Sequence, residues 1–201
     1  ALFYCKEDKT LHDLMSSSGF GCSTSGYSTH DHLIEEGLTN LIDDDNNKIP
    51  IEIFGEHNLQ NLKAAQLVCH KLGVDSSGFY NAIKSFKGAS KRLELVAKNK
   101  TFAFYKDFAH SPSKLKATTQ ALKKQFPNRE LIACLELHTF SSLNKSFLSL
   151  YDNSMSKANA ALVYYNKETI KHKKLEDLSE ETVASAFGTS NIEVYTSSKE
   201  L

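Results

Sequence analysis

The sequence predicts an α/β protein, and two features carry this prediction. From Arg92 onward, short apolar segments of strand character alternate with segments of helical periodicity, at a spacing that favours right-handed crossovers and a largely parallel sheet. The linker-like segment Lys87-Gly88-Ala89-Ser90 separates this pattern from the helices that precede it. We therefore expect two domains, over residues 1–88 and 89–201.

In the first domain, the regular elements follow from hydrophobic periodicity and from turn residues. The strands expected are Leu2–Cys5 and Ile49–Phe54, and the helices are Thr10–Ser17, Asn58–Leu72 and Ser77–Phe86. The Gly/Ser-rich segment 16–26 is expected to be a loop. The acidic segment 43–48 is expected to be the solvated tip of a hairpin, because three consecutive carboxylates lack the spacing of metal ligands.

In the second domain, strands and helices alternate. The strands expected are Leu93–Ala97, Thr101–Phe108, Leu131–Leu137, Ala160–Tyr165 and Ile192–Tyr195. The helices expected are Ser113–Gln125, Leu143–Lys157 and Leu178–Phe187. The strand over 131–137 is expected to be buried, and Cys69 and Cys134 are expected to be small core residues.

The composition excludes several classes of protein. Lys and Arg total 24, as do Asp and Glu, so no surplus of positive charge exists to neutralise a nucleic acid. No apolar run reaches the roughly 18 residues of a membrane helix, and no signal peptide opens the chain, so we expect no membrane insertion and a cytoplasmic location. The 4 scattered cysteines form no CxxC pair, and His30-Asp31-His32 lacks a third ligand, so no metal site is expected.

Asn58 and Asn61 form the first candidate site. They are three residues apart at the start of a predicted helix, so they share one face of its first turn. An Asn amide offers both a donor and an acceptor, which is the pair needed to bind an adenine edge. Two asparagines near a helix start are also common as helix caps, and the residues alone leave both interpretations open.

The other candidates lie just past the expected domain boundary and at the next strand-to-helix turn. Arg92, oriented by Glu94, could donate to ribose or phosphate oxygens, or the two could be a surface ion pair. Asp107 ends a predicted strand and could accept protons from sugar hydroxyls. His110, beside a helix amino end, suits phosphate contact or charge stabilisation, or is a hydrogen-bonded loop histidine.

The order and spacing of these residues resemble the Mur ligase family, the ATP-dependent amide ligases that build bacterial peptidoglycan precursors. The resemblance extends from Leu2 and is strongest between Ile51 and Leu148. The matching motifs are Gly55-x-His57-Asn58-x-x-Asn61, Phe86-x-Gly88 with Lys91-Arg92-x-Glu94, and Asp107-Phe108-Ala109-His110-x-Pro112.

The resemblance implies a role for each candidate residue. Asn58 and Asn61 would contact adenine, and Arg92 and Asp107 would bind the nucleotide ribose or a nearby phosphate. His110 would lie at the incoming substrate and the γ-phosphate, and Lys91 stands where related ligases often carry a cation or an imidazole. ATP and Mg²⁺ are the implied cofactors, and a substrate carboxylate is expected to react through an acyl phosphate.

The resemblance also implies which part of a ligase this is. Residues 1–88 would be the tail of an α/β P-loop ATPase domain, and 89–201 a carboxyl-terminal Rossmann-like domain. The chain contains no Gly-Lys-Ser/Thr, so it lacks the phosphate loop and is expected to be inactive alone. Two alternatives remain, a nucleotide-binding module without chemistry and a plain Rossmann-like domain whose Asn and His residues are structural.

The expected substrates follow from the branch of the family. Ser111 stands where one branch has a second histidine, and the segment 136–143 is similar to one shared by two branches. Ser111, and the likeness of this segment taken together with Asp107-Phe108-Ala109-His110, favour the recycling branch, in which UDP-N-acetylmuramate is joined to the tripeptide L-alanyl-γ-D-glutamyl-meso-diaminopimelate. The branch that joins the same acid to L-alanine is the alternative.

Overall fold

The structure is a computed structural model, which describes residues 1–17, 19–189 and 191–199. The chain divides into two compact units, Ala1–Gly88 (unit 1) and Ala89–Leu201 (unit 2). The division falls within the linker-like segment 87–90. Each unit has its own hydrophobic core, and the two are described separately below.

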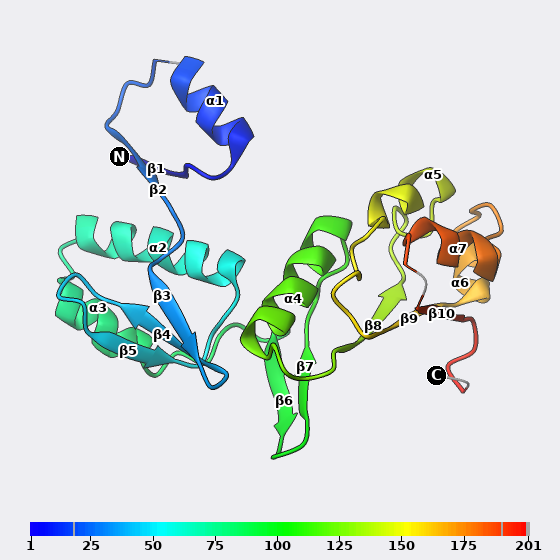
Figure 1. Ribbon diagram of the computed structural model, residues 1–201. Helices are drawn as coiled ribbons and strands as arrows, with labels where there is room; N and C mark the ends of the chain where they lie inside the picture. The colour runs from blue at the N-terminus through cyan, green and yellow to red at the C-terminus, as the bar shows by residue number, and fades with distance from the viewer. Residues whose placement is uncertain (18, 190, 200–201) are drawn as a thin grey trace. The chain divides into compact units, whose positions relative to one another are not determined.

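Among its described residues, unit 1 forms two small sheets and three helices (Figure 1). The parallel pair consists of β1 (Leu2–Cys5) and β2 (Thr24–Tyr27). The antiparallel sheet consists of β3 (His32–Glu35), β4 (Leu38–Ile42) and β5 (Lys48–Ile51), in that order. The helices are α1 (Lys9–Ser17), α2 (Glu56–Lys71) and α3 (Ser76–Ile83).

Three strands of unit 1 were not expected from the sequence. β2 lies in the Gly/Ser-rich segment that predicted a loop, of which Ser18 lies outside the described residues. β3 and β4 form a hairpin whose two-residue turn is Glu36-Gly37, with φ of 52° and 75° at these residues. Positive φ at both central positions gives a turn whose twist matches that of the strands. The expected hairpin tip at 43–48 is confirmed as the connection between β4 and β5.

Asp43 organises that tip, and Gly73 ends α2. Oδ1 of Asp43 accepts from the backbone N–H of Asn47 at 2.7 Å and of Asp45 at 3.0 Å, which closes the turn. At the end of α2, Gly73 has φ 94°, which residues with a Cβ rarely adopt. The N–H of Val74 then donates to Cys69 O at 3.0 Å and closes the last turn of the helix.

A chain of buried polar groups runs through unit 1. Gln66 Nε2 donates to Tyr80 Oη at 2.9 Å, and Tyr80 Oη lies 2.9 Å from His30 Nε2. His30 Nδ1 lies 2.9 Å from Asp31 O, which can only accept, so Nδ1 carries the proton and Nε2 accepts from Tyr80. His30, one of the two histidines of the discounted metal pair, is therefore a buried core residue.

Unit 2 begins with an antiparallel hairpin, β6 (Glu94–Lys98) and β7 (Ala103–Lys106). Asn99 shapes its tip, because Oδ1 accepts from the backbone N–H groups of Thr101 and Phe102 at 2.8 Å each. The hairpin forms a sheet of its own. The strand–helix alternation from Arg92 had predicted that these two strands would belong to the parallel sheet, but they do not.

A three-stranded parallel sheet is the centre of unit 2, which confirms the predicted α/β class. Its strands are β8 (Ile132–Leu137), β9 (Ala160–Tyr165) and β10 (Ile192–Tyr195), in the order β10-β9-β8. The helices of this unit are α4 (Pro112–Gln125), α5 (Lys145–Leu148), α6 (Lys167–His172) and α7 (Glu180–Ala186).

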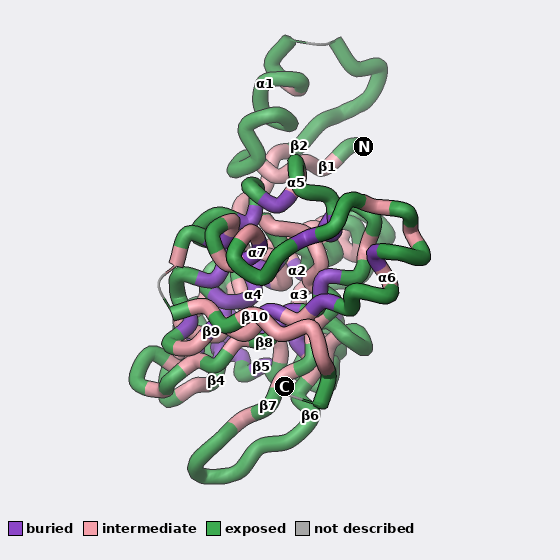
Figure 2. The backbone as a smooth tube through the Cα atoms, turned by 90° about the vertical axis from the view of Figure 1, so that its right-hand side faces the viewer, coloured by how far each residue is buried: buried purple, intermediate pink, exposed green. Residues whose placement is uncertain are grey.

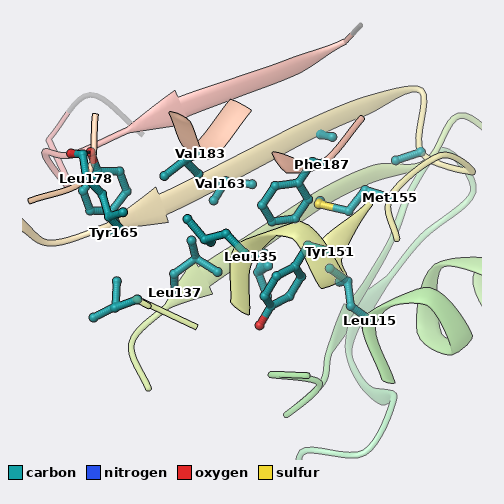
Figure 3. Close-up of a cluster of buried hydrophobic side chains, with 14 of the residues drawn as sticks. Leu115, Leu135, Leu137, Tyr151, Met155, Val163, Tyr165, Leu178, Val183 and Phe187 are labelled. Atoms are coloured by element: carbon teal, nitrogen blue, oxygen red, sulfur yellow. Dashed lines mark hydrogen bonds between the residues drawn. The ribbon is translucent and has the colours of Figure 1, made fainter. Parts of the chain in front are cut away.

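One face of this sheet holds the core of unit 2 (Figure 3). Alternate residues of β9, Ala161, Val163 and Tyr165, have no exposed surface, as the period of two in a strand requires. The helices add side chains to the same cluster: Leu115, Leu148, Ile170, Val183 and Phe187.

The opposite face of β8 is open, and the expectation of a buried strand was wrong there. Ile132 is 68% exposed and Cys134 is also exposed, while Leu135 and Leu137 are buried. Cys134 is therefore not a core residue, and Cys69 is only half-buried. A continuous apolar run fits a strand buried on both faces, but this strand is buried on one.

The long helix expected over Leu143–Lys157 does not form. Asn144 begins α5 by accepting from the N–H of Ser146 at 2.9 Å, and after Leu148 the chain continues only as a 3₁₀ turn, Ser149–Tyr151. Asn153 then adopts φ 56°, and its N–H donates to Phe187 O at 3.0 Å. Tyr151 and Met155 are both completely buried on this non-helical segment. Their spacing of four residues also fits the period of a helix, and this is why the sequence pattern predicted one.

α6 was not expected, because it is short and has a single buried residue, Ile170. Its start is marked by Asn166, whose Oδ1 accepts from the N–H of Glu168 at 2.8 Å. α7 falls within the range predicted, and Ser179 caps it by accepting from the N–H of Thr182 at 3.2 Å.

Figure 2 shows where the chain is exposed. α1 has no buried residue, and most of the β6–β7 hairpin is also exposed. Within the described ranges, none of the helices combines the length and the apolar character that crossing a bilayer demands.

Phe187→Ala is expected to destabilise unit 2 by about 3–5 kcal/mol. The ring has no exposed surface and stacks on Tyr151 with 5.0 Å between ring centroids. Leu150→Ala is the control, because Leu150 is 60% exposed, and it should change the free energy of unfolding by less than about 0.5 kcal/mol. Urea unfolding followed by circular dichroism measures both. Equal losses in the two variants would contradict the core described here.

Unit 1 is expected to lose stability as the pH falls below 6.5, because burial lowers the pKa of His30 from that value. Between pH 6.5 and the folded pKa, the unfolded chain binds more protons at His30 than the folded chain, so acid favours unfolding. His30→Gln should lose this part of the pH dependence. Urea midpoints of both proteins across this range provide the measurement, and identical slopes would rule out His30 as the source.

Candidate functional site

The candidate residues form two groups, one in each unit. Asn58 and Asn61 lie in the first two turns of α2 in unit 1. Lys91, Arg92, Asp107 and His110 lie between the start of unit 2 and the start of α4. The geometry of each group is given within its own unit.

Asn58 is partly engaged by the backbone that precedes α2. Its Nδ2 donates to Phe54 O at 2.8 Å, so it does not cap the helix, whose N-cap is Gly55. The carboxamide has two N–H hydrogens and one oxygen, so one donor and one acceptor remain beyond this bond. Asn61 is exposed one turn later. The structure therefore leaves the pair able to bind a ligand that offers a donor and an acceptor.

Lys91 and Arg92 are exposed side chains on a tightly folded segment. Lys91 has φ 56° and Leu93 has φ 46°, both in the left-handed region that residues with a Cβ rarely occupy. The N–H of Arg92 donates to Ala89 O at 3.1 Å, which closes a turn between them. The turn directs two cations outward at the amino end of unit 2.

Glu94 binds the backbone of this turn instead of orienting Arg92, so that expectation was wrong. Its Oε2 accepts from the N–H of Lys91 at 2.7 Å and from Ser90 Oγ at 3.2 Å. The bond from the Lys91 N–H is the main cause that lowers the pKa of Glu94. Sequence spacing showed that Glu94 was close to the cations but not which group it would bind.

Asp107 is held at the end of β7 by hydrogen bonds from three directions. Its Oδ1 accepts from the N–H of Leu93 at 3.2 Å and of Phe108 at 2.9 Å. Its Oδ2 accepts from Thr118 Oγ1 on α4 at 2.5 Å. Thr118 was not among the expected site residues, because a threonine inside a helix gives no signal in the sequence.

His110 is fixed by the strand end and by the core. Its Nδ1 lies 2.9 Å from Phe108 O, and a carbonyl only accepts, so Nδ1 carries a proton and Nε2 is the nitrogen left for a ligand. The rings of His110 and Phe108 have their centroids 5.0 Å apart. The ring of His138, after β8, lies 6.5 Å from that of Phe108. Three aromatic rings are therefore close together at the ends of β7 and β8.

Tyr151 fastens His110 to the core of unit 2. Its hydroxyl donates to His110 O at 2.6 Å, although the ring is fully buried. Burial raises the pKa of Tyr151 to about 12, so the hydroxyl stays protonated and remains a donor. No sequence pattern indicated this bond, because Tyr151 was expected in a long helix.

The chemistry available at these two groups is binding of polar and anionic groups. Lys91 and Arg92 offer exposed positive charge, and His110 Nε2 can accept a proton or, once protonated, donate one. Among the described residues, no cluster of three or more His, Cys, Asp or Glu side chains could hold a metal ion. Both groups thus present side chains that can bind polar or anionic ligand groups.

Two curated relatives share part of the sequence. The UDP-N-acetylmuramate–L-alanine ligase of Caldicellulosiruptor bescii is 39% identical over 115 residues, which are 57% of this chain and 25% of that protein. The corresponding ligase of Cytophaga hutchinsonii is 31% identical over 134 residues, which are 65% of this chain and 28% of that protein. The chain thus spans about a quarter of these relatives. No family model matches it.

Solved structures share the fold over nearly the whole chain. MurC, the UDP-N-acetylmuramate–alanine ligase of Thermotoga maritima, matches 96% of this chain and 43% of its own, with a TM-score of 0.66 and 16% identity. MurF of Acinetobacter baumannii matches 98% of this chain and 43% of its own, with a TM-score of 0.70 and 12% identity. The folylpolyglutamate synthase of Mycobacterium tuberculosis, solved with ADP, matches 87% and 39%, with a TM-score of 0.59 and 18% identity.

Tyr151→Phe is expected to lower the free energy of unfolding by about 0.5–1.5 kcal/mol, because it removes the donor to His110 O. The difference from the parent protein should be constant up to about pH 10, where a tyrosine in the unfolded chain ionises. Above it the difference should shrink, because the folded tyrosine, with its pKa near 12, keeps its proton longer. Urea unfolding across this range tests this, and a difference of zero at neutral pH would contradict it.

The sequence comparison and the structure comparison point to the same family. The sequence match covers 57% and 65% of the chain in the two relatives, and the fold of the two Mur proteins covers 96% and 98%. By sequence over more than half its length, and by fold over nearly all of it, the chain is therefore a relative of the Mur ligases.

Proposed function

We propose that this chain is the carboxyl-terminal part of an ATP-dependent carbon–nitrogen ligase that joins UDP-N-acetylmuramate to an amine. The observation that carries the proposal is the group formed by Lys91, Arg92, Asp107 and His110, held together on a fold that these ligases share. The names of the sequence relatives supply the acid substrate. In this reading, unit 1 is the tail of the ATP-binding domain and unit 2 is the carboxyl-terminal domain.

The adenine base is assigned to Asn58 and Asn61. Asn58 keeps one donor and one acceptor after its bond to Phe54 O, and Asn61 is exposed one turn further along α2. A purine edge presents a donor beside an acceptor, which an amide can match. The related folylpolyglutamate synthase binds ADP, which supports a nucleotide for this fold.

The phosphates and the reacting carboxylate are assigned to unit 2. Arg92 and Lys91 would neutralise anionic oxygens, and Asp107 has room to accept from a ribose hydroxyl. His110 Nε2 would face the incoming substrate and the γ-phosphate. Mg²⁺ would supply charge neutralisation for the phosphoryl group, and the described residues offer no metal cage, so its ligands would come largely from the nucleotide and from other residues.

The reaction class is acyl transfer through an acyl phosphate. The carboxylate of UDP-N-acetylmuramate attacks the γ-phosphorus, and ADP leaves. The amine nitrogen then attacks the acyl carbon, phosphate leaves, and the proton of the amine passes to a base or to water. Lys91, Arg92 and His110 contribute by stabilising the negative charge that develops on oxygen in both steps.

The amine substrate divides into two candidates. The named relatives use L-alanine, and they match over more than half of this chain. Ser111, which stands where the L-alanine branch has a second histidine, favours the tripeptide L-alanyl-γ-D-glutamyl-meso-diaminopimelate instead. We propose the tripeptide, with L-alanine as the alternative, and a cytoplasmic location where both the nucleotide sugar and ATP are available.

The first test is a substrate panel. The chain alone is expected to release no phosphate from ATP, because it contains no phosphate loop. A longer protein that carries this chain behind such a loop should release phosphate only when UDP-N-acetylmuramate and an amine are both present. The tripeptide and L-alanine are compared as amines. Adenine-nucleotide binding without turnover under every combination would favour a binding module without chemistry.

Asn61→Ala is the second test. Loss of one amide contact to adenine should raise the KM for ATP about 3- to 10-fold and leave the KM for the amine unchanged, since one hydrogen bond contributes about 0.5–1.5 kcal/mol. Asn128→Ala is the matched control, because Asn128 is an exposed asparagine of unit 2 outside both groups. Steady-state phosphate release provides both constants. An equal effect of the two variants would remove Asn61 from the nucleotide site.

A further inference from the structure

The segment 90–93 has an unfavourable backbone that other residues must hold in place. Lys91 and Leu93 both have positive φ, 56° and 46°, although neither is a glycine. A side chain with a Cβ disfavours this region, so an isolated peptide of this sequence would leave it. Leu93 is buried and anchors the segment, whereas Lys91 and Arg92 are exposed.

Glu94 holds the first half of the segment. A single oxygen, Oε2, accepts from the N–H of Lys91 at 2.7 Å and from Ser90 Oγ at 3.2 Å. The pKa of Glu94 is lowered chiefly by the bond from Lys91, as expected for a carboxylate that accepts from the backbone. The carboxylate therefore bridges the residue before Lys91 and Lys91 itself.

Asp107 and Thr118 hold the second half. The N–H of Leu93 donates to Asp107 Oδ1 at 3.2 Å, and the N–H of Phe108 donates to Lys91 O at 2.9 Å, so the segment is tied to the end of β7 twice. Thr118, a buried residue of α4, donates from Oγ1 to Asp107 Oδ2 at 2.5 Å. This bond fixes the carboxylate orientation that places Oδ1 at Leu93.

We propose that Glu94 and Thr118 are positioning residues, which hold the left-handed turn of 90–93 and thereby set the directions of Lys91 and Arg92. We call the hydrogen bonds of Glu94, Asp107 and Thr118 that hold segment 90–93 the clamp. The clamp is a property of unit 2 alone, whereas the identity of the ligand that Lys91 and Arg92 bind rests on the proposed function. Asp107 is shared between the two roles. With three donors on its two oxygens, it keeps about one acceptor position, on Oδ2, for a ligand hydroxyl.

Amide hydrogen exchange in the 201-residue chain tests the Thr118 half. Thr118→Val removes the hydroxyl and keeps the shape, so the protection of the Leu93 amide should fall about tenfold or more. Thr118→Ser restores a hydroxyl and should restore the protection. Thr119→Val is the matched control, because Thr119 is a buried neighbour on α4 whose hydroxyl donates to Ser154 O and not to Asp107. Unchanged protection in Thr118→Val, or an equal loss in Thr119→Val, overturns the proposal.

The Glu94 half has a spectroscopic signature. In the parent chain, the Lys91 amide proton should shift as Glu94 is protonated, with a midpoint below the usual 4.5, because the bonded carboxylate has a lowered pKa. Glu94→Gln should abolish this titration but keep the turn, since its amide oxygen can still accept. Glu130→Ala, the loss of an exposed carboxylate elsewhere in unit 2, should leave it intact. A Lys91 amide that titrates unchanged in Glu94→Gln overturns this half.

Kinetics of the longer ligase then connect the clamp to function. Thr118→Val and Glu94→Ala should raise the KM for ATP several-fold, and Thr118→Ser should recover most of the affinity. If exchange and titration behave as expected but no ligase activity exists, the clamp stands and the proposed function fails. If the variants lose the clamp by exchange while KM and kcat stay as in the parent, Glu94 and Thr118 are structural residues only and the positioning role is overturned.

Discussion

The carboxylate of Asp107 is the interaction on which the candidate site of unit 2 depends. From the end of β7, where it also accepts from the neighbouring Phe108, it binds the turn before β6 through Leu93 and α4 through Thr118. Without it, Lys91 and Leu93, both in unfavourable left-handed conformations, would be held by Glu94 and by the bond from the Phe108 N–H to Lys91 O. A residue expected to bind a ligand therefore also maintains the geometry of its neighbours.

His110, the other candidate residue near α4, is attached to the core of unit 2 by one hydrogen bond from Tyr151. Tyr151 is fully buried, stacks on Phe187, and donates its hydroxyl to the backbone carbonyl of His110. Packing in the apolar cluster beside β8 and β9 holds the Tyr151 ring in one position. Because the ring is held, its hydroxyl also restrains the backbone at His110. Functional loops commonly gain precision in this way, from side chains locked by packing beneath them.

Much of the fold could be predicted from the sequence. Elements with strong periodicity and clear end signals were placed to within a few residues, including α2, which Gly73 ends, and α4, which Pro112 begins. The failures occurred where local pattern and tertiary packing disagree. The apolar residues of 143–157 have helical spacing, yet the chain around Asn153 forms turns with a positive φ, and Tyr151 and Met155 are both completely buried. The sequence also did not predict that β8 is buried on one face only, or that β3 and β4 form a hairpin, because neither burial nor strand pairing can be read from a local pattern alone.

The sequence by itself determined the α/β class and a division of the chain near Gly88, and it singled out the candidate residues, because periodicity, turn residues and motif order are local properties. Only the tertiary structure decided how those residues are held. Glu94 binds the Lys91 backbone instead of Arg92, and Thr118 and Tyr151 join the site from elements with no motif. The partner of a hydrogen-bonding group depends on the distances and directions that the backbone conformation and packing create, whether the two residues are three apart, as Lys91 and Glu94 are, or far apart, as Tyr151 and His110 are.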